Sequence, residues 1–120
     1  MATRYEVQIE NGDTFFFHLR SGDGRVILRS LGSPSKIMTQ NEILHLRDAV
    51  RDPARLVSHD DHGRYFLVVK DRDGSVLAKS PRVDSGDELQ VLTKEVIAAA
   101  AAPIVDLCKR AVAQKSVAEK

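Results

Sequence analysis

The hydrophobic residues near the start of the chain follow the period of two that is typical of strands. Tyr5, Val7 and Ile9 alternate with polar residues, which predicts a half-buried strand. Two more strands are expected over 14–20 and 25–31, because both stretches are rich in apolar strand-forming residues. The Asp-Gly pair between them favours a two-residue hairpin turn with positive φ at both positions. The opening of the chain therefore predicts three consecutive strands.

A helix is expected after these strands. Residues 39–42 read Thr-Gln-Asn-Glu and match a capping box, in which Thr39 caps the helix and the glutamate bonds back to it. Ile43, Leu46 and Val50 recur at helical spacing, and Pro53 lies just beyond, where a helix should stop. The first part of the chain thus predicts the order strand, strand, strand, helix.

The same order of elements recurs fifty residues later, without a gap in the alignment. The identities at this offset include Phe16/Phe66, Asp23/Asp73, Gly24/Gly74, Val26/Val76, Ser30/Ser80, Ser35/Ser85, Gln40/Gln90 and Ala49/Ala99. A weak strand is expected over 55–58, a hairpin over 65–80, and a helix after a second capping box at 85–88. We interpret the pattern as two tandem β-β-β-α repeats, spanning about 4–52 and 54–102.

The predicted fold class is α+β, with one antiparallel sheet and both helices packed on one face. Beyond Pro103, an apolar stripe at Ile104, Leu107, Cys108 and Ala111 has helical spacing. It predicts an extra C-terminal helical segment over 103–120. The length of 120 residues fits a single domain, residues 1–120.

Hairpin pairing assigns the strand residues to two faces, because Leu19 should lie opposite Leu28. The face expected to be buried carries Phe15, Phe17, Leu19, Val26 and Leu28, with Tyr65, Leu67, Val69, Val76 and Ala78 in the second copy. The opposite face carries Phe16, His18, Arg20, Ile27, Arg29, Phe66, Val68, Lys70, Leu77 and Lys79. Large apolar side chains recur there in both copies and are rimmed by cations.

Two functions are compatible with this opposite face. An exposed apolar patch predicts an interface, either with a second copy in a homodimer or with another protein, although scattered exposed apolar residues are also normal. The combination of Phe16 and Phe66 with nearby cations would also suit single-stranded nucleic acid. The whole chain has 18 basic and 17 acidic residues, and this net charge of +1 disfavours a dedicated nucleic-acid binder.

The run His59, Asp60, Asp61 and His62 is a candidate site for a divalent metal such as Zn²⁺. The alternative is an ordinary polar hairpin loop, because four adjacent residues rarely converge on one ion without a further ligand. Other chemistry is not indicated. Gly22-Asp23-Gly24 opens no helix and fits a hairpin turn, and Cys108 fits a small core residue.

The predicted function is therefore a non-enzymatic interaction or structural module without a cofactor. A single cysteine favours a reducing compartment, and no apolar run is long enough for a membrane span, so a cytoplasmic protein is expected.

The hairpin-and-helix pattern resembles the YegP-like family of small bacterial proteins. The matching residues are Phe15, Phe17, Leu19, Gly22-Asp23-Gly24, Val26-Ile27, Ser30 and Ser35-Lys36. The resemblance covers about residues 5–50 clearly and 55–100 faintly, and it implies a tandem β3α repeat with one antiparallel sheet and two helices. It supplies neither an activity nor a catalytic residue. The chain departs from the family pattern in its Asp-Gly turn and in Ser85-Gly86, which stands in place of Ser-Lys.

Overall fold

The computed structural model describes residues 2–108. The elements along the chain are β1 (Arg4–Glu10), β2 (Thr14–Arg20), β3 (Val26–Ser30), α1 (Lys36–Ala49), the short 3₁₀ helix η1 (Pro53–Arg55), β4 (Leu56–Asp61), β5 (Arg64–Lys70), β6 (Val76–Lys79), α2 (Gly86–Ala99) and β7 (Ile104–Asp106).

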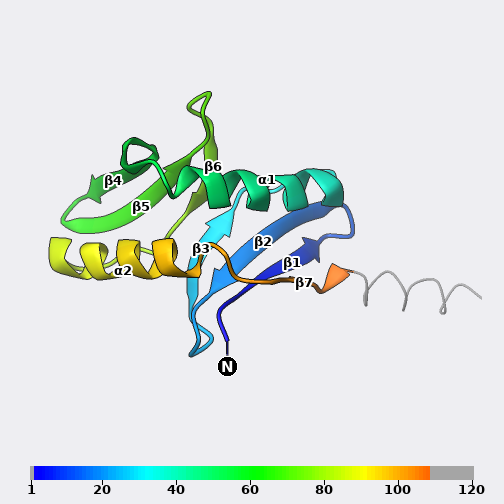
Figure 1. Cartoon of the computed structure of the whole chain (residues 1–120), viewed down its shortest axis with the longest axis horizontal. Helices are drawn as coiled ribbons and strands as arrows, with labels where there is room; N and C mark the ends of the chain where they lie inside the picture. The colour runs from blue at the N-terminus through cyan, green and yellow to red at the C-terminus, as the bar shows by residue number, and fades with distance from the viewer. Residues whose placement is uncertain (1, 109–120) are drawn as a thin grey trace, which may run out of the picture.

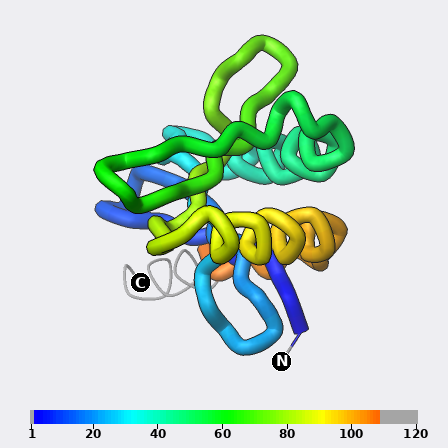
Figure 2. Tube along the Cα trace, turned by 90° about the vertical axis from the view of Figure 1, so that its left-hand side faces the viewer, coloured from blue at the N-terminus to red at the C-terminus, as the bar shows by residue number. Residues whose placement is uncertain are grey.

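The strands form one seven-stranded sheet in the order β4-β5-β6-β3-β2-β1-β7, in which β7 alone runs parallel to its neighbour. Both helices lie on the same side of the sheet (Figure 1). The α+β class and the mainly antiparallel sheet are therefore confirmed. The β2–β3 and β5–β6 hairpins project in opposite directions from the sheet (Figure 2). We call the sheet face under the helices the inner face and the other one the outer face.

The β2–β3 hairpin differs from the predicted two-residue turn. Only Gly24 has a positive φ, at 88°, and its N–H donates to the carbonyl of Ser21 over 3.0 Å. The Ser21 N–H donates to the Arg25 carbonyl over 2.9 Å, which leaves three residues in the loop, and the register shifts by one at Leu19/Arg20. This bulge absorbs the extra loop residue, so Leu19 still lies opposite Leu28, as predicted.

The bulge also corrects the assignment of residues to the two faces. It places Arg20 opposite Val26, so Val26 shares the outer face with Arg20, and Ile27 turns into the core with 1% of its surface exposed. The β5–β6 hairpin has the same shift, and Leu77 is a core residue as well. Ile27 and Leu77 therefore do not belong to the outer face, contrary to the prediction.

Both helices begin with a serine cap. The side chain of Ser35 accepts a hydrogen bond from the Met38 N–H over 3.2 Å, so α1 begins at Lys36 and the predicted cap at Thr39 is wrong. Thr39 lies one turn inside the helix, where it is fully buried. The cap predicted at Ser85 is confirmed, with its side chain accepting from the Glu88 N–H over 3.1 Å.

The first residues of the predicted C-terminal helical segment form a strand in place of a helix. Ile104–Asp106 form β7, which pairs in parallel with β1, because backbone groups on the open side of β1 are available to it. Cys108 is fully buried in the core, as predicted, and burial together with the Asp106 charge raises the pKa of its thiol. Residues 109–120 of the predicted helical segment lie outside the described residues.

The core lies between the inner face and the helices. The strand residues in it include Tyr5, Val7, Phe17, Leu19, Leu28, Leu67, Val69 and Ala78. The helices contribute Ile43, Leu46, Leu89, Leu92 and Val96, which recur at the spacing that places them on one side of a helix. No helix among residues 2–108 is long and apolar enough to cross a membrane.

Several contacts recur at an offset of fifty residues. The buried Ser30 and Ser80 side chains accept hydrogen bonds from the N–H groups of Phe17 and Leu67, each over 2.8 Å. The offset is not constant, however. The turn between β1 and β2 has three residues between the paired Glu10 and Thr14, whereas the turn between β4 and β5 has two between Asp61 and Arg64. Because the second turn is one residue shorter, β1 residues match β4 residues at an offset of 51.

Glu42 breaks the match between the helices. It stands where α2 has the buried Leu92, and its Oε1 is buried without a hydrogen-bond partner among residues 2–108. Burial raises the pKa of Glu42 above its ordinary value of 4.5. Because the folded state binds the Glu42 proton more tightly than the unfolded state, this group stabilises the fold below pH 4.5. That contribution is lost as the pH rises through the folded-state pKa, so the ionised carboxylate is unfavourable at pH 7.

We therefore expect Glu42→Leu to raise the free energy of unfolding at pH 7 by about 1 kcal/mol, because it removes an unsatisfied buried oxygen. Urea denaturation at pH 7 and near pH 3 measures the change, and the gain should be smaller at the acidic pH. A loss of stability at pH 7 would show that the Glu42 carboxylate has a favourable role in the fold.

Candidate binding site on the outer sheet face

The aromatic rings of the outer face are covered by the chain's own polar side chains. The Arg29 guanidinium lies 4.3 Å from the centre of the Phe16 ring, and the His18 ring meets it edge-on at 5.2 Å. Phe16 is only 5% exposed as a result. Arg29 is held in turn by Glu10 at 3.4 Å.

Phe66 has similar cover on the other half of the sheet. The His59 ring stacks on it at 5.1 Å with 13° between the planes, and the Arg82 guanidinium lies 5.3 Å from the ring centre. Asp61 pairs with Arg82 at 2.8 Å and fixes that guanidinium. Val68, two residues along β5 from Phe66, is 3% exposed. The predicted exposed apolar patch is therefore wrong, because arginine and histidine side chains cover it.

Charged groups on the β1–β2 side of this face are paired. Glu6 accepts from Arg20 Nε at 2.6 Å and from Arg4 Nε at 2.8 Å. Burial alone would raise the pKa of Glu6. The hydrogen bonds from Arg20 and Arg4, together with the positive charges of these two arginines, lower it below its ordinary value. Burial, followed by the Arg20 and Arg29 charges, lowers the pKa of His18, so neutral His18 is favoured beside Phe16.

The centre of the face carries two cations in direct opposition. Arg29 on β3 lies opposite Lys79 on β6, where the two halves of the sheet join. Like charges at such a position are destabilising. No carboxylate among residues 2–108 forms an ion pair with Lys79, so its ammonium group is uncompensated in the described part of the chain.

A pocket of about 350 Å³ lies beside this pair. Apolar side chains of Val26, Leu31 and Pro81 line it together with Arg29 and Lys79. Leu31 is half exposed, and it is one of the few large apolar residues that open to solvent near the sheet. We call this pocket and its two cations the seam site. The sequence placed both cations on the outer face, but the pocket could not be seen, because Val26 was assigned to the core.

Lys70 is the remaining cation of the predicted face, and it lies opposite Val76 at the end of β5. It does not line the pocket.

The candidate metal ligands do not gather around a common point. His59 and Asp61 lie in β4 on the outer face, engaged by Phe66 and Arg82, whereas Asp60 accepts a hydrogen bond from the Gly63 N–H over 2.9 Å. His62 stands in the turn with its side chain 99% exposed. No group of three or more potential metal-binding side chains was found among residues 2–108.

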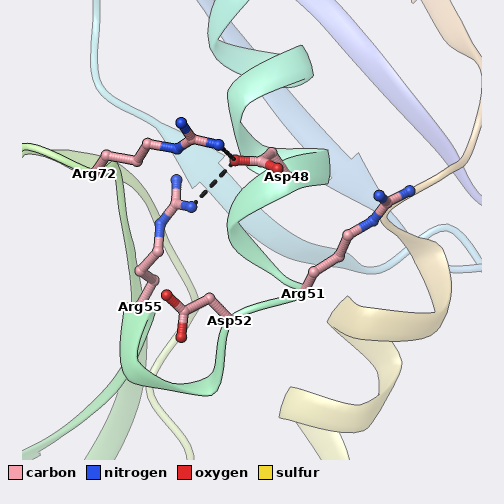
Figure 3. Close-up of a pocket in the computed structure, with 5 residues that line it drawn as sticks. All are labelled: Asp48, Arg51, Asp52, Arg55 and Arg72. Atoms are coloured by element: carbon pink, nitrogen blue, oxygen red, sulfur yellow. Dashed lines mark hydrogen bonds and ion pairs between the residues drawn. The ribbon is translucent and has the colours of Figure 1, made fainter.

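The sequence did not reveal a second polar cluster, at the C-terminal end of α1 (Figure 3). Its pocket of about 490 Å³ is lined by Asp48, Arg51, Asp52, Arg55 and Arg72. Arg55 and Arg72 both point to the Asp48 carboxylate, each at 3.2 Å, whereas Arg51 points away. Hydrogen bonds from Arg55 and then Arg72 lower the pKa of Asp48.

Arg55 also donates from Nε to the Lys70 carbonyl over 3.1 Å and pairs with Asp71 at 3.3 Å. It therefore ties α1, η1 and the β5–β6 hairpin together. The Asp48 and Asp71 carboxylates accept from the Arg55 guanidinium, and Asp48 also accepts from Arg72. Because these cations are already paired within the chain, we assign the cluster a role in stability.

Comparisons with known proteins rest on the fold. No protein-family model matches this chain, and no curated protein matches it. The solution structure of YegP from E. coli, a protein of unknown function, is similar with a TM-score of 0.83 and 20% identity over 89% of this chain and 94% of YegP. The UPF0339 protein SO3888 from Shewanella oneidensis is similar with a TM-score of 0.83 and 24% identity, covering 89% of this chain and 92% of that protein. The resemblance to the YegP-like family found in the sequence is thus confirmed in the fold, which this chain shares with YegP and SO3888.

Proposed function

We propose that this chain is a non-enzymatic interaction module that binds an acidic segment of a partner protein at the seam site. The uncompensated Lys79 opposite Arg29 carries the proposal. Sites where a chain keeps an unfavourable local arrangement are expected to be functional, and an incoming carboxylate would compensate the Lys79 charge, whereas Arg29 is already paired with Glu10.

The walls of the pocket support a protein partner. Val26, Leu31 and Pro81 offer apolar surface directly beside the cations. Protein interfaces combine an apolar centre with a polar rim in this way. A partner segment with an aliphatic residue next to Glu or Asp would satisfy both parts of the site.

Single-stranded nucleic acid is a weaker candidate. Base stacking needs open aromatic faces, but Arg29 covers the Phe16 ring, and His59 and Arg82 cover Phe66. Self-association through the outer face has lost most of its original support as well, because Phe16, Val68, Ile27 and Leu77 are buried and Phe66 is half-buried.

The proposal is tested with ¹⁵N-labelled protein and two probes, a short peptide of alternating Glu and Leu and a mixed single-stranded oligonucleotide. We expect the peptide to shift the amide signals of residues 26–31 and 76–81. Lys79→Gln should remove these shifts, while the free energy of unfolding stays equal or rises by about 0.5 kcal/mol, because a like-charge pair is lost.

Lys70→Gln is the matched control, since Lys70 lies on the same face but outside the pocket. It should leave peptide binding unchanged. Peptide shifts that survive in Lys79→Gln, or oligonucleotide shifts at low salt in place of peptide shifts, would contradict the proposal.

We also propose that the two halves arose by duplication of one β3α unit within the YegP-like family. The serine caps at Ser35 and Ser85 and the buried serines at Ser30 and Ser80 support this origin. The proposal explains why the seam site lies between matching strands, with equivalent residues Arg29 and Lys79 in opposition.

A further inference from the structure

The two halves differ at the outer edges of the sheet, beside the helices. In the first half, β7 covers the edge of β1: the Tyr5 N–H donates to the Pro103 carbonyl and the Leu107 N–H to the Val7 carbonyl, each over 2.9 Å. Asp106 on β7 also pairs with Lys36 at the start of α1, at 2.6 Å. An extended segment of the chain therefore closes the space between β1 and α1.

The effect of this segment is visible in burial. Val7 on β1 and both Thr39 and Ile43 on α1 are fully buried. Their counterparts in the second half are Ser58, Leu89 and Thr93. Leu89 is buried, but Ser58 is exposed and Thr93 is half-buried, so the corresponding space in the second half is more open to solvent.

The opening is a groove of about 500 Å³ between β4, β5 and α2. Its apolar lining comes from Tyr65 and Leu89, and Gln90, Thr93 and Lys94 of α2 complete it. Ser58 on the edge strand β4 lies at its border with solvent. We call it the α2 groove.

The backbone of β4 can accept a further strand at the same place. Leu67 directs its N–H to the Ser80 side chain and its carbonyl to the Ser80 N–H, each over 2.8 Å. Its partner across the ladder, Ser58, therefore directs its own N–H and C=O to the open edge. The Leu56 N–H is already bonded to the Pro53 carbonyl, so pairing with an added strand would begin after it.

We propose that the β4 edge and the α2 groove bind an extended segment of a partner protein, added parallel to β4 as β7 is added to β1. The bound segment carries an aliphatic side chain that enters the groove over Tyr65 and Leu89. It also carries a carboxylate that reaches Lys94, the cation that lines the groove. Main-chain hydrogen bonds provide affinity in this mode, and the alternating side chains provide specificity.

This proposal is independent of the seam site, which lies on the other face of the sheet. The chain's own sequence Pro103–Leu107, Pro-Ile-Val-Asp-Leu, shows the chemistry that fits the equivalent space. A blocked peptide of this sequence is therefore the probe. With ¹⁵N-labelled full-length protein, we expect shifts at residues 57–60 and 86–94, with residues 36–44 unchanged.

The groove offers a matched pair of variants, because Gln90 of α2 corresponds to Gln40 of α1. Gln90→Trp should fill the groove and weaken peptide binding by about tenfold or more, as expected when a central pocket is blocked. Gln40→Trp should leave the affinity unchanged. Lys94→Glu should weaken binding as well, and thermal melting shows whether each variant remains folded.

Three results would overturn the proposal. The first is an absence of shifts at about 1 mM peptide, a concentration that detects even weak complexes. The second is a set of shifts confined to β1 and α1, which would mean that the probe exchanges with β7. The third is binding that occurs only in a chain ending at Cys108, which would mean that the chain itself occupies the groove.

Discussion

Replacing Phe17 with alanine is expected to lower the free energy of unfolding by about 4 kcal/mol, the usual cost of truncating a fully buried phenylalanine. Phe17 has no exposed surface, and its ring packs edge-on against Tyr5 at a distance of 5.6 Å between ring centres. Both rings lie between the inner face and α1, where backbone elements on two sides limit the collapse of the cavity. Guanidinium denaturation followed by circular dichroism measures the change.

Phe16→Ala is the matched control, one residue along the same strand. Its neighbours Arg29 and His18 are side chains at the surface and can close over the space, so we expect a loss of about 2 kcal/mol. If Phe16→Ala proved more destabilising than Phe17→Ala, the assignment of the inner and outer faces would be wrong.

The second large effect is expected for Arg55→Met, which should lower the free energy of unfolding by about 2 kcal/mol, because charge-assisted hydrogen bonds of a nearly buried group are lost. The Arg55 side chain is 12% exposed and contacts Asp48, Asp71 and the Lys70 carbonyl. Methionine keeps much of the apolar stem but replaces none of these bonds. Urea denaturation of the variant and the parent protein gives the difference.

Arg51→Met provides the comparison within the same pocket. The Arg51 side chain points away from Asp48, and we expect its replacement to change stability by less than about 0.5 kcal/mol, as is usual for surface substitutions. Equal losses in the two variants would contradict the role assigned to Arg55 as the link between α1, η1 and the β5–β6 hairpin.

The parts of the fold that the sequence predicted correctly depend on local patterns. Alternation at Tyr5, Val7 and Ile9 identified β1, and the apolar runs around Asp-Gly located the hairpin with Leu19 opposite Leu28. The cap at Ser85 was recognisable because an acidic first turn follows it. These signals need no knowledge of the rest of the chain.

The errors arose where distant residues decide the outcome. Ile104, Leu107 and Cys108 have helical spacing, yet pairing with β1 makes 104–106 a strand, and three residues are too few for periodicity to distinguish the two. The bulge at Leu19/Arg20 moved Ile27 into the core, because a single extra residue in one strand changes the face of the next side chain.

The candidate sites show the same division. Alternation correctly placed Phe16 and Phe66 on the outer face, but it could not show that Arg29 and Arg82 cover their rings. The cluster around Asp48 was not predicted, because Arg72 is 24 residues away from it in the sequence. The α2 groove became visible only when the burial of equivalent residues in the two halves could be compared.

The central claim is that β3 and β6 join the two halves with Arg29 directly opposite Lys79 on the face without helices. Nuclear Overhauser contacts between backbone protons of these strands test it most directly. We expect contacts that pair Arg29 with Lys79 and Ser30 with Ala78. A register displaced by one residue would send one of the two cations to the inner face and would contradict both the fold described here and the seam site.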